Sequence, residues 1–321
     1  MRIGILGKGG SGKTTLSAAL IKYFALKKYN VLGVDADQNV NLASTLNSNF
    51  SVNLSDHSKD VLDYFHMLRD DLKGFPLIGS IPPSNNSRFI RLNENDAFLK
   101  NYSKNTEFAY LIQAGSYTVN DVGVSCYHGK QEVLEAVYHH LLDTEKDIII
   151  TDLTAGVDSV GNSMYLVHDV LFFVLEPSIK SVDVFLNFIK ITDGLNLKVK
   201  VIINKLRTEE DMIFLKNKIT DLDKYVLASF NDDSLIHDVE KGLFDALDNF
   251  VLKYVEEFNK IENYTKTVER DWSAYFKRIV EHHKKSCLAW HDSFYGKKIS
   301  ELIDLDFSYE QVLGENNDNS A

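Results

Sequence analysis

The chain has 321 residues, of which 44% are hydrophobic and 25% are charged, and its formal net charge is −11. This length suits one large α/β domain with an added module. The acidity argues against tight, sequence-independent DNA binding, because that affinity comes from basic side chains on phosphates.

No apolar run reaches the roughly 18–20 residues that span a bilayer. The start of the chain lacks a signal-peptide pattern, and two cysteines exclude a disulfide framework. We therefore expect a cytoplasmic protein without membrane attachment.

Short apolar runs alternate with helical patterns along the chain, which is typical of a parallel sheet with helices on both faces. Strands are expected at 2–7, 30–35, 107–113, 147–152, 170–176, 199–203 and 225–230. Helices are expected at 13–28, 129–143, 178–193 and 208–220. The runs 147–150 and 170–175 are apolar without alternation, as in strands buried on both faces. The predicted fold class is α/β, a mostly parallel sheet flanked by helices.

Two stretches depart from this alternation. Residues 49–105 are polar and irregular, with a loop signal at Pro82-Pro83. After about residue 250 the pattern changes to long amphipathic helices, expected at 243–262 and 265–291. We predict an α/β domain over 1–250, a helical extension over 251–313 and a polar, disordered tail over 314–321.

A glycine-rich loop follows the first strand and opens the first helix. It consists of Lys8, Gly9, Gly10, Ser11, Gly12, Lys13, Thr14 and Thr15. Such a loop points backbone N–H groups at an anion, beside a helix N-terminus. Lys13 would reach the β- and γ-phosphates, and the Thr14 hydroxyl would take a Mg²⁺ position. The sequence therefore predicts a site for a nucleoside triphosphate with Mg²⁺.

Lys8 at the start of this loop would repel Lys13 unless an anion or a second molecule separates the two charges. With Lys8, the loop resembles that of the deviant Walker A ATPases, which include the ParA/MinD partition proteins, arsenite-pump ATPases and the nitrogenase iron protein. In that group the corresponding lysine reaches across a nucleotide-sandwiched dimer to the phosphates of the partner. The resemblance implies ATP as the nucleotide, a catalytic role for Lys8 and an ATP-dependent homodimer.

Polar residues after three further strands complete the expected nucleotide site. Asp35 and Asp37 end the strand at 30–35, where ligands bind in open α/β sheets; the alternative is a solvated turn or a helix cap. The family resemblance implies that Asp37 positions or activates the attacking water and that Asp35 supports the metal. It also implies that Asp152 orders the Mg²⁺ shell. Asn204 resembles the residue that reads adenine, and a structural cap is its alternative.

A more specific resemblance rests on four motifs, which are the stretches 35–42, 123–128, 152–157 and 174–178. Together these motifs resemble the nickel-insertion ATPases that mature carbon monoxide dehydrogenase. That family carries Cys-x-Cys where this chain has Cys126-Tyr127-His128. Thiolate and imidazole both bind Zn²⁺ or Ni²⁺, so Cys126 and His128 of two chains would form a site at the dimer interface. The alternative is a buried free cysteine beside a surface histidine. An iron–sulfur reductase is disfavoured, because Ala155 stands where a cluster ligand would be required.

The C-terminal helices carry His283, Cys287 and His291 at a spacing of four residues. These side chains share one helix face but span about 12 Å, too far for one ion. We expect instead a polar stripe with Cys287 and Trp290 packed inward. The extension exceeds the length of the nickel-insertion proteins, and we expect it to bind a protein client.

Three functions are compatible with these features. The first is an ATP-hydrolysing dimeric switch that serves as a metallochaperone or maturation factor. The second is a ParA-like partition or positioning ATPase that binds a DNA or protein scaffold, which the net acidity disfavours for DNA. The third is a slow regulatory switch in which the extension acts and hydrolysis only resets it.

Overall fold

The computed structural model describes residues 1–121, 123, 127–156 and 163–314. Within them, one sheet has the strand order β3-β4-β2-β5-β1-β6-β7-β8. Its strands are β1 (Arg2–Gly7), β2 (Asn30–Asp35), β3 (Lys104–Asn105), β4 (Tyr110–Gln113), β5 (Asp147–Asp152), β6 (Val170–Leu175), β7 (Val199–Leu206) and β8 (Val226–Asn231). Neighbouring strands pair in parallel except β3 and β4, which are antiparallel. The predicted mostly parallel sheet is confirmed, and the short edge strand β3 is an addition to it.

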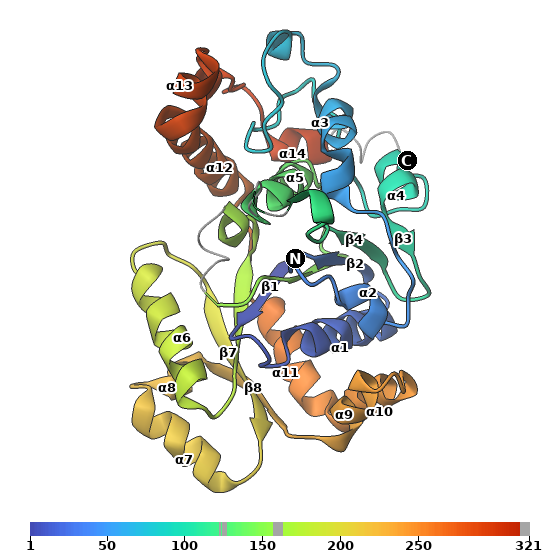
Figure 1. Ribbon diagram of the computed structural model, residues 1–321, viewed down its shortest axis with the longest axis vertical. Coiled ribbons are helices and arrows are strands. Elements are labelled where there is room, and N and C mark those ends of the chain that lie inside the picture. The colour runs from blue at the N-terminus through green and yellow to red at the C-terminus, as the bar shows by residue number, and fades with distance from the viewer. Residues whose placement is uncertain (122, 124–126, 157–162, 315–321) are drawn as a thin grey trace.

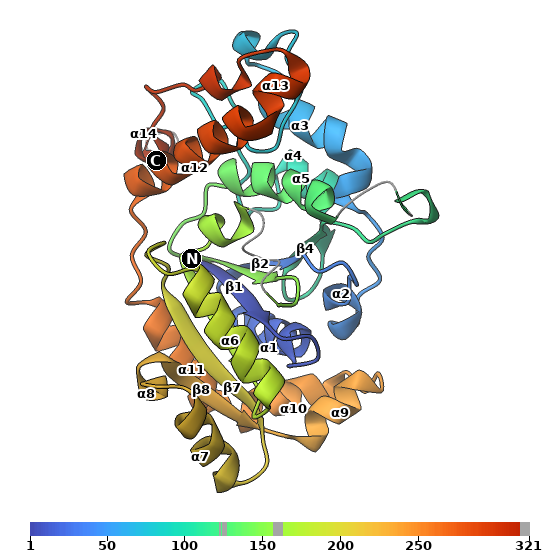
Figure 2. The same ribbon diagram turned by 60° about the vertical axis from the view of Figure 1, so that its left-hand side comes forward.

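Helices cover both faces of this sheet (Figure 1, Figure 2). They are α1 (Lys13–Leu26), α2 (Leu42–Thr45), α3 (Ser58–His66), α4 (Ala97–Tyr102), α5 (Tyr127–His139), α6 (Ile179–Ile191), α7 (Glu209–Lys218), α8 (Leu222–Tyr225), α9 (Ser234–Glu240), α10 (Asp245–Lys253), α11 (Val255–Thr265), α12 (Trp272–Ser286), α13 (Asp292–Tyr295) and α14 (Tyr309–Gly314). A π-helix at Cys287–His291 joins α12 to α13, and a 3-10 helix occupies Ser163–Val167. None of the helices in the described ranges is long and apolar enough to cross a membrane.

The sheet separates two hydrophobic clusters, and β6 contributes to both. Phe173 and Leu175 belong to the cluster under α3, α5 and α6, whereas Phe172 and Val174 belong to the cluster under α1, α10 and α11. Every residue of β6 is buried. A strand covered on both faces can be apolar at every position, which explains its lack of alternation.

The C-terminal helices differ in extent from the prediction. The helix expected at 243–262 is wrong as a single element, because α10 and α11 are separated at Tyr254, whose hydroxyl donates to Asp233 at 3.0 Å. The helix expected from residue 265 begins at Trp272 instead, where Asp271 caps it by accepting from the backbone N–H of Ala274 at 2.8 Å.

The segment 49–105 also contains more regular structure than expected, since α3 and α4 lie within it. Phe65 of α3 stacks on Phe98 of α4 with ring centroids 5.3 Å apart, and both rings are fully buried. Tertiary packing of these aromatic rings stabilises two short helices that the local sequence pattern does not favour.

The C-terminal part of the chain packs in two places. Phe250 of α10 and Phe258 of α11 share the cluster under α1, whereas α12 and α14 lie near α5 (Figure 2). The predicted domain boundary at 250 falls within α10, and the division into domains stays a prediction. The predicted tail at 314–321 begins with the last residue of α14, and residues 315–321 lie outside the described residues.

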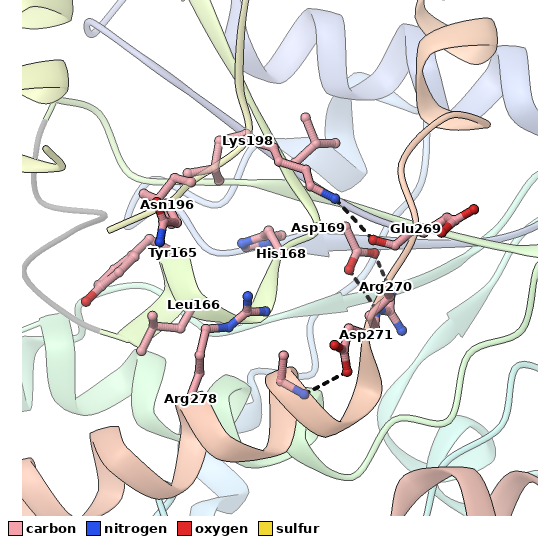
Figure 3. Close-up of a pocket in the computed structure, with 14 residues that line it drawn as sticks. Tyr165, Leu166, His168, Asp169, Asn196, Lys198, Glu269, Arg270, Asp271 and Arg278 are labelled. Carbon is pink, nitrogen blue, oxygen red and sulfur yellow. Dashed lines mark hydrogen bonds and ion pairs between the residues drawn. The ribbon is translucent and has the colours of Figure 1, made fainter. Parts of the chain in front are cut away.

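Buried ion pairs fasten the segment between α11 and α12 to the sheet. Arg270 of that segment binds both oxygens of Asp143, at 2.7 and 2.8 Å, and also binds Asp169 immediately before β6. Figure 3 shows Arg270 directed at Asp169. The pocket beside these two residues has a volume of about 130 Å³. Arg2 of β1, fully buried, donates its Nε–H to the same Asp143 at 2.9 Å. Two guanidinium groups thus share the carboxylate of Asp143 at the amino-terminal edge of the central strands, and Arg270 alone also binds that of Asp169.

Candidate nucleotide-binding site

The glycine-rich loop joins β1 to α1 at the carboxyl-terminal edge of the sheet (Figure 1). Gly12 is the N-cap residue of α1 and has no side chain that could cap the helix, so the first N–H groups of α1 remain available to an anion. Gly12 precedes the helix with φ 96°, and a Cβ atom there would lie 2.4 Å from the amide nitrogen of Asn204. Only glycine fits this backbone conformation without displacing Asn204.

The two lysines of the loop differ in environment. Lys13 is 6% exposed, and its Nζ lies 3.5 Å from the backbone oxygen of Lys8. Burial lowers the pKa of Lys13, and Lys8 lowers it further, whereas Asp152 and Asp37 raise it. A phosphate group at this place would favour the charged lysine, so the environment of Lys13 fits a polyanion.

Lys8 is held within its own chain in this structure. Its Nζ forms an ion pair with Glu176 at 3.0 Å and donates to the backbone oxygen of Gly9 at 2.8 Å. Glu176 follows β6, so strands β1 and β6, which are neighbours, bring the pair together. Glu176 belongs to the motif 174–178 that the sequence indicated, but its ion pair with Lys8 was not predicted.

Asp152 ends β5 and faces the start of α1. The Thr14 hydroxyl donates to it at 2.6 Å, and the Ser17 hydroxyl donates at 3.4 Å. Burial raises the pKa of Asp152, and the negative charge of Asp35 on the neighbouring strand raises it further. A divalent cation would relieve both effects, and a threonine hydroxyl beside a carboxylate suits Mg²⁺.

Asp35 and Asp37 have different partners. Asp35 is buried and accepts from the backbone N–H groups of Leu42, at 2.8 Å, and of Asp37, at 3.1 Å. Burial raises the pKa of Asp35 while these N–H groups lower it. Asp37 is only half-buried and accepts from the backbone and side chain of Asn39, both at 2.9 Å. Asp35 therefore shapes the turn that follows β2. Asp37, in contrast, is accessible to a water molecule near the glycine-rich loop.

Asn204 and Lys205 fasten the glycine-rich loop from the end of β7. The Asn204 amide donates to the backbone oxygen of Ser11 at 2.9 Å, and Lys205 donates to that of Gly10 at 2.7 Å. Lys205 has φ 61°, within a register irregularity between β7 and β8. The amide of Asn204 thus supports the loop in this structure, and its reading of adenine stays a prediction. Lys205, next to Asn204 in the chain, is a further loop contact that the sequence did not assign.

Two buried hydroxyls support the fit of a polar ligand. Ser11 Oγ and Thr154 Oγ1 have no hydrogen-bond partner among the described residues. Buried hydroxyls without partners are unfavourable, which indicates that something absent from the chain itself satisfies them. Ser11 lies in the glycine-rich loop together with Gly9, Gly10, Thr14 and Thr15. The residues present therefore fit a nucleotide with Mg²⁺.

The predicted Zn²⁺ or Ni²⁺ site is not tested by this geometry. Cys126 lies outside the described residues, and the side chain of His128 in α5 is not described either. Over the ranges that are described, no three His, Cys, Asp or Glu side chains are grouped to hold a metal ion.

The His283, Cys287 and His291 stripe is occupied by internal contacts. The His283 ring contacts Ser80 Oγ at 3.1 Å and the backbone oxygen of Ile299 at 3.0 Å, through its two nitrogens. Cys287 is fully buried, as expected, but Trp290 is 55% exposed, so its predicted inward packing is wrong. The π-helix adds a residue to this turn and thereby rotates Trp290 out of phase with Cys287.

Residues 5–243 match the family model described as the CobQ/CobB/MinD/ParA nucleotide binding domain. An uncharacterized ATP-binding protein of Methanocaldococcus jannaschii is 26% identical, over 82% of this chain and 97% of its own. The carbon monoxide dehydrogenase accessory protein CooC of Rhodospirillum rubrum is 24% identical, over 77% of this chain and 90% of its own.

Solved structures share the fold at low sequence identity. The cell division ATPase MinD of Pyrococcus furiosus covers 82% of this chain and 98% of its own, with a TM-score of 0.57 and 19% identity. A ParA family ATPase from Chlorobium tepidum covers 80% of this chain and 95% of its own, with a TM-score of 0.54 and 16% identity. The family model covers well over half of the residues, and the loop, the buried lysine and the Thr14–Asp152 pair agree with it. The chain therefore belongs to the CobQ/CobB/MinD/ParA nucleotide-binding family.

Proposed function

We propose that the protein is an ATP-binding and ATP-hydrolysing dimeric switch that serves a client protein as a metallochaperone or maturation factor. The observation that carries the ATPase proposal is the Thr14–Asp152 pair beside the buried Lys13. Relatives named as ATP-binding proteins, and a Pyrococcus horikoshii MinD structure described as complexed with Mg-ADP, support the choice of nucleotide.

Each residue of the site has a distinct proposed role. Thr14 and Asp152, with Asp35 behind them, hold Mg²⁺, which stabilises negative charge on the phosphates when it is bound. Lys13 and the N–H groups of the loop bind and orient the phosphates. Asp37, which is accessible, positions the attacking water.

We propose that on dimer formation Lys8 leaves Glu176 and binds a phosphate of the partner's nucleotide. In the single chain its charge is neutralised by Glu176 at 3.0 Å. Both side chains are partly exposed, at 27% and 15%, and an exposed ion pair of this kind stabilises a structure by only about 0–1 kcal/mol. A phosphate of the partner's nucleotide carries more charge than one carboxylate, so Lys8 can leave Glu176 when a second nucleotide-loaded chain approaches.

The test separates the two lysines of the loop. We expect Lys13→Ala to weaken nucleotide binding about 10- to 100-fold, because it removes charge-assisted hydrogen bonds of about 1.5–3 kcal/mol. We expect Lys8→Ala to bind nucleotide nearly as well as the wild type but to hydrolyse ATP at least about tenfold more slowly, a barrier increase of about 1.4 kcal/mol. The measurements are binding of a fluorescent ATP analogue and phosphate release at increasing protein concentration.

Lys59→Ala, at an exposed lysine of α3, is the matched control for loss of a positive charge. Wild-type turnover by Lys8→Ala, with the same dependence on protein concentration, would refute the role across the dimer.

The client part of the proposal rests on the extension. Leu288, Trp290 and Phe294 are 68%, 55% and 63% exposed, and the rings of Trp290 and Phe294 stack with centroids 4.5 Å apart. Exposed aromatic groups are enriched at protein interfaces. The named role of CooC as an accessory protein of carbon monoxide dehydrogenase supports maturation as the kind of process.

The metal part of the proposal is tested at Cys126. If Cys126 and His128 of two chains bind Zn²⁺ or Ni²⁺, the purified dimer should contain about one ion per two chains, because a four-ligand site needs both chains. Cys126→Ala should lose this ion, measured by elemental analysis, while Cys287→Ala at the buried cysteine should retain it. An unchanged metal content in the Cys126→Ala protein would remove the metallochaperone part and leave the ATPase part intact.

A further inference from the structure

A second cavity lies between α5 and the C-terminal extension, away from the glycine-rich loop. Its volume is about 260 Å³, and α5 contributes Glu132 and Glu135 to its wall while the extension contributes His282 and His291. This volume is below the roughly 300–1,000 Å³ of pockets for drug-sized ligands. The cavity therefore suits a short molecule or a single inserted side chain.

Glu135 is the unusual group in this cavity. Its side chain is only 8% exposed, and its Oε1 has no hydrogen-bond partner among the described residues. Burial raises the pKa of Glu135 to about 8, an effect that a hydrogen bond from Ser163 partly offsets and Glu132 increases. Leaving a buried carboxyl oxygen without a partner is unfavourable by roughly 1–3 kcal/mol.

Two imidazoles of the described residues lie close to Glu135 but do not hydrogen-bond to its Oε1. The Nε2 atoms of His282 and His139 lie 3.4 and 3.9 Å from Glu135 Oε1. Burial lowers the pKa of His282, and Lys285 lowers it further. Burial also lowers the pKa of His139. Both imidazoles are therefore neutral at pH 7, and neither forms an ion pair with Glu135.

The polar groups of the wall decide the kind of ligand. Glu132, Glu135 and neutral imidazoles offer hydrogen-bond acceptors, and none of the described residues that line the cavity is a lysine or arginine. An anion would find no positive charge there. Since no three metal-ligating side chains of the described residues converge on one point, a compact metal ion would not be satisfied either. An organic cation with several N–H donors can reach acceptors that are spread around a cavity.

We propose that this cavity binds a primary ammonium or guanidinium group, with the carboxylates of Glu135 and Glu132 as its principal partners. A bound cation favours the ionised form of Glu135, whose pKa burial raises to about 8 in the free protein, and it then forms charge-assisted hydrogen bonds with the orphaned oxygen of Glu135. The cation is either a small free amine or a basic side chain of a partner polypeptide. Because α5 and α12 both line the cavity, the bound cation joins the extension to the nucleotide-binding domain. This site does not depend on the proposed ATPase function.

The test measures cation binding by isothermal titration calorimetry on the full chain. The probes are agmatine, a free guanidinium amine, and a terminally blocked Gly-Arg-Gly peptide, with uncharged N-butylurea as the reference ligand. We expect at least one charged probe to bind and N-butylurea not to bind. Binding of agmatine alone identifies a small amine as the ligand, and binding of the peptide identifies a basic side chain.

Glu135→Gln should weaken binding of the charged probe at least tenfold, because the amide keeps the shape of the side chain but cannot ionise. Glu281→Gln removes the same charge at an exposed position of α12 and should bind like the wild type. Ser286→Met, at a half-buried serine of the wall, should block the cavity without changing its charge and is decisive if Glu135→Gln does not fold.

The proposal would be overturned by equal binding of the probe by folded Glu135→Gln or by folded Ser286→Met. Binding of N-butylurea as tight as that of agmatine would also overturn it. Stoichiometric Zn²⁺ binding that requires Glu135 would also overturn it in favour of a metal site. Binding of the fluorescent ATP analogue, measured on the same samples, should be unchanged and keeps this test separate from that of the glycine-rich loop.

Discussion

Asp143→Asn is expected to lower the free energy of unfolding by about 3–5 kcal/mol, because it leaves a buried guanidinium without its carboxylate. Asp143 is 1% exposed on its side chain and binds Arg2, whose side chain is fully buried, and Arg270. Asparagine keeps the shape but offers one acceptor oxygen and no charge. Urea unfolding at pH 7, followed by circular dichroism, measures the difference.

The pH dependence provides a second check on Asp143. Burial alone would raise the pKa of Asp143, but Arg2 and Arg270 hold it well below its usual range. A carboxyl with a lowered pKa stabilises the fold above the unfolded-state pKa of about 3.9, and this contribution disappears as the pH falls through the folded-state pKa. The difference between wild type and variant should therefore be constant from pH 7 to about pH 5 and should shrink in stronger acid.

Asp63→Asn is the control, because Asp63 forms an exposed ion pair with Lys59 on one helix. Such pairs stabilise by about 0.3–0.5 kcal/mol, so this variant should stay within about 0.5 kcal/mol of the wild type. If Asp143→Asn were as mild as Asp63→Asn, the buried ion pairs would not hold the segment before α12 to the sheet.

The glycine-rich loop could be predicted because its chemistry lies in consecutive residues. Gly12, Lys13 and Thr14 occupy the loop and first helical turn that their spacing indicates. The sheet was predictable for a related reason, since apolar runs such as 170–175 are what a strand buried on both faces requires. Local sequence contains both signals.

Contacts between distant segments were not predictable. The pairing of Lys8 with Glu176, and of Asn204 with Ser11, depends on which strands are neighbours in the sheet. Strand order is set by the packing of the whole chain, which a single sequence does not display. Glu135 is a similar case, because its burial results from α12 covering α5, and the sequence shows only a glutamate on an amphipathic helix.

The helices of the extension show how periodicity alone can fail. The apolar spacing across 243–262 continues through Tyr254, yet the backbone breaks there. Trp290 follows Cys287 at a spacing of three, which places both on one face of a regular α-helix. The π-helix changes the angle between these two side chains. It is apparent only in the folded structure, where Cys287 packs against Ile299 and Leu302.

Buried histidines are expected to make the fold sensitive to mild acid. Burial lowers the pKa of His140 to about 3 and that of His168 and His283 to about 4. The unfolded chain takes up these protons near pH 6.5, whereas the folded chain does not until much lower pH. A lowered histidine pKa therefore reduces stability as the pH falls below about 6.5, by about 2 kcal/mol for each such group at pH 5. Glu135 opposes the trend, because its raised pKa favours the folded state as it takes up a proton.

His140→Gln isolates one of these groups from the rest. The His140 ring stacks on Phe65 with centroids 4.5 Å apart, and its Nδ1 lies 2.8 Å from the backbone oxygen of Ala136, so the variant should be less stable than the wild type at pH 7. Between pH 7 and pH 5 the wild type should lose about 2 kcal/mol relative to the variant, because only the wild type carries the buried imidazole. Urea unfolding at both pH values measures this double difference, and His57→Gln, at an exposed histidine, is the control. A difference between wild type and His140→Gln that stays constant from pH 7 to pH 5 would show that the imidazole keeps its ordinary pKa in the fold, as a ring that reaches water does. This result would contradict the dry packing of His140 between α5 and Phe65.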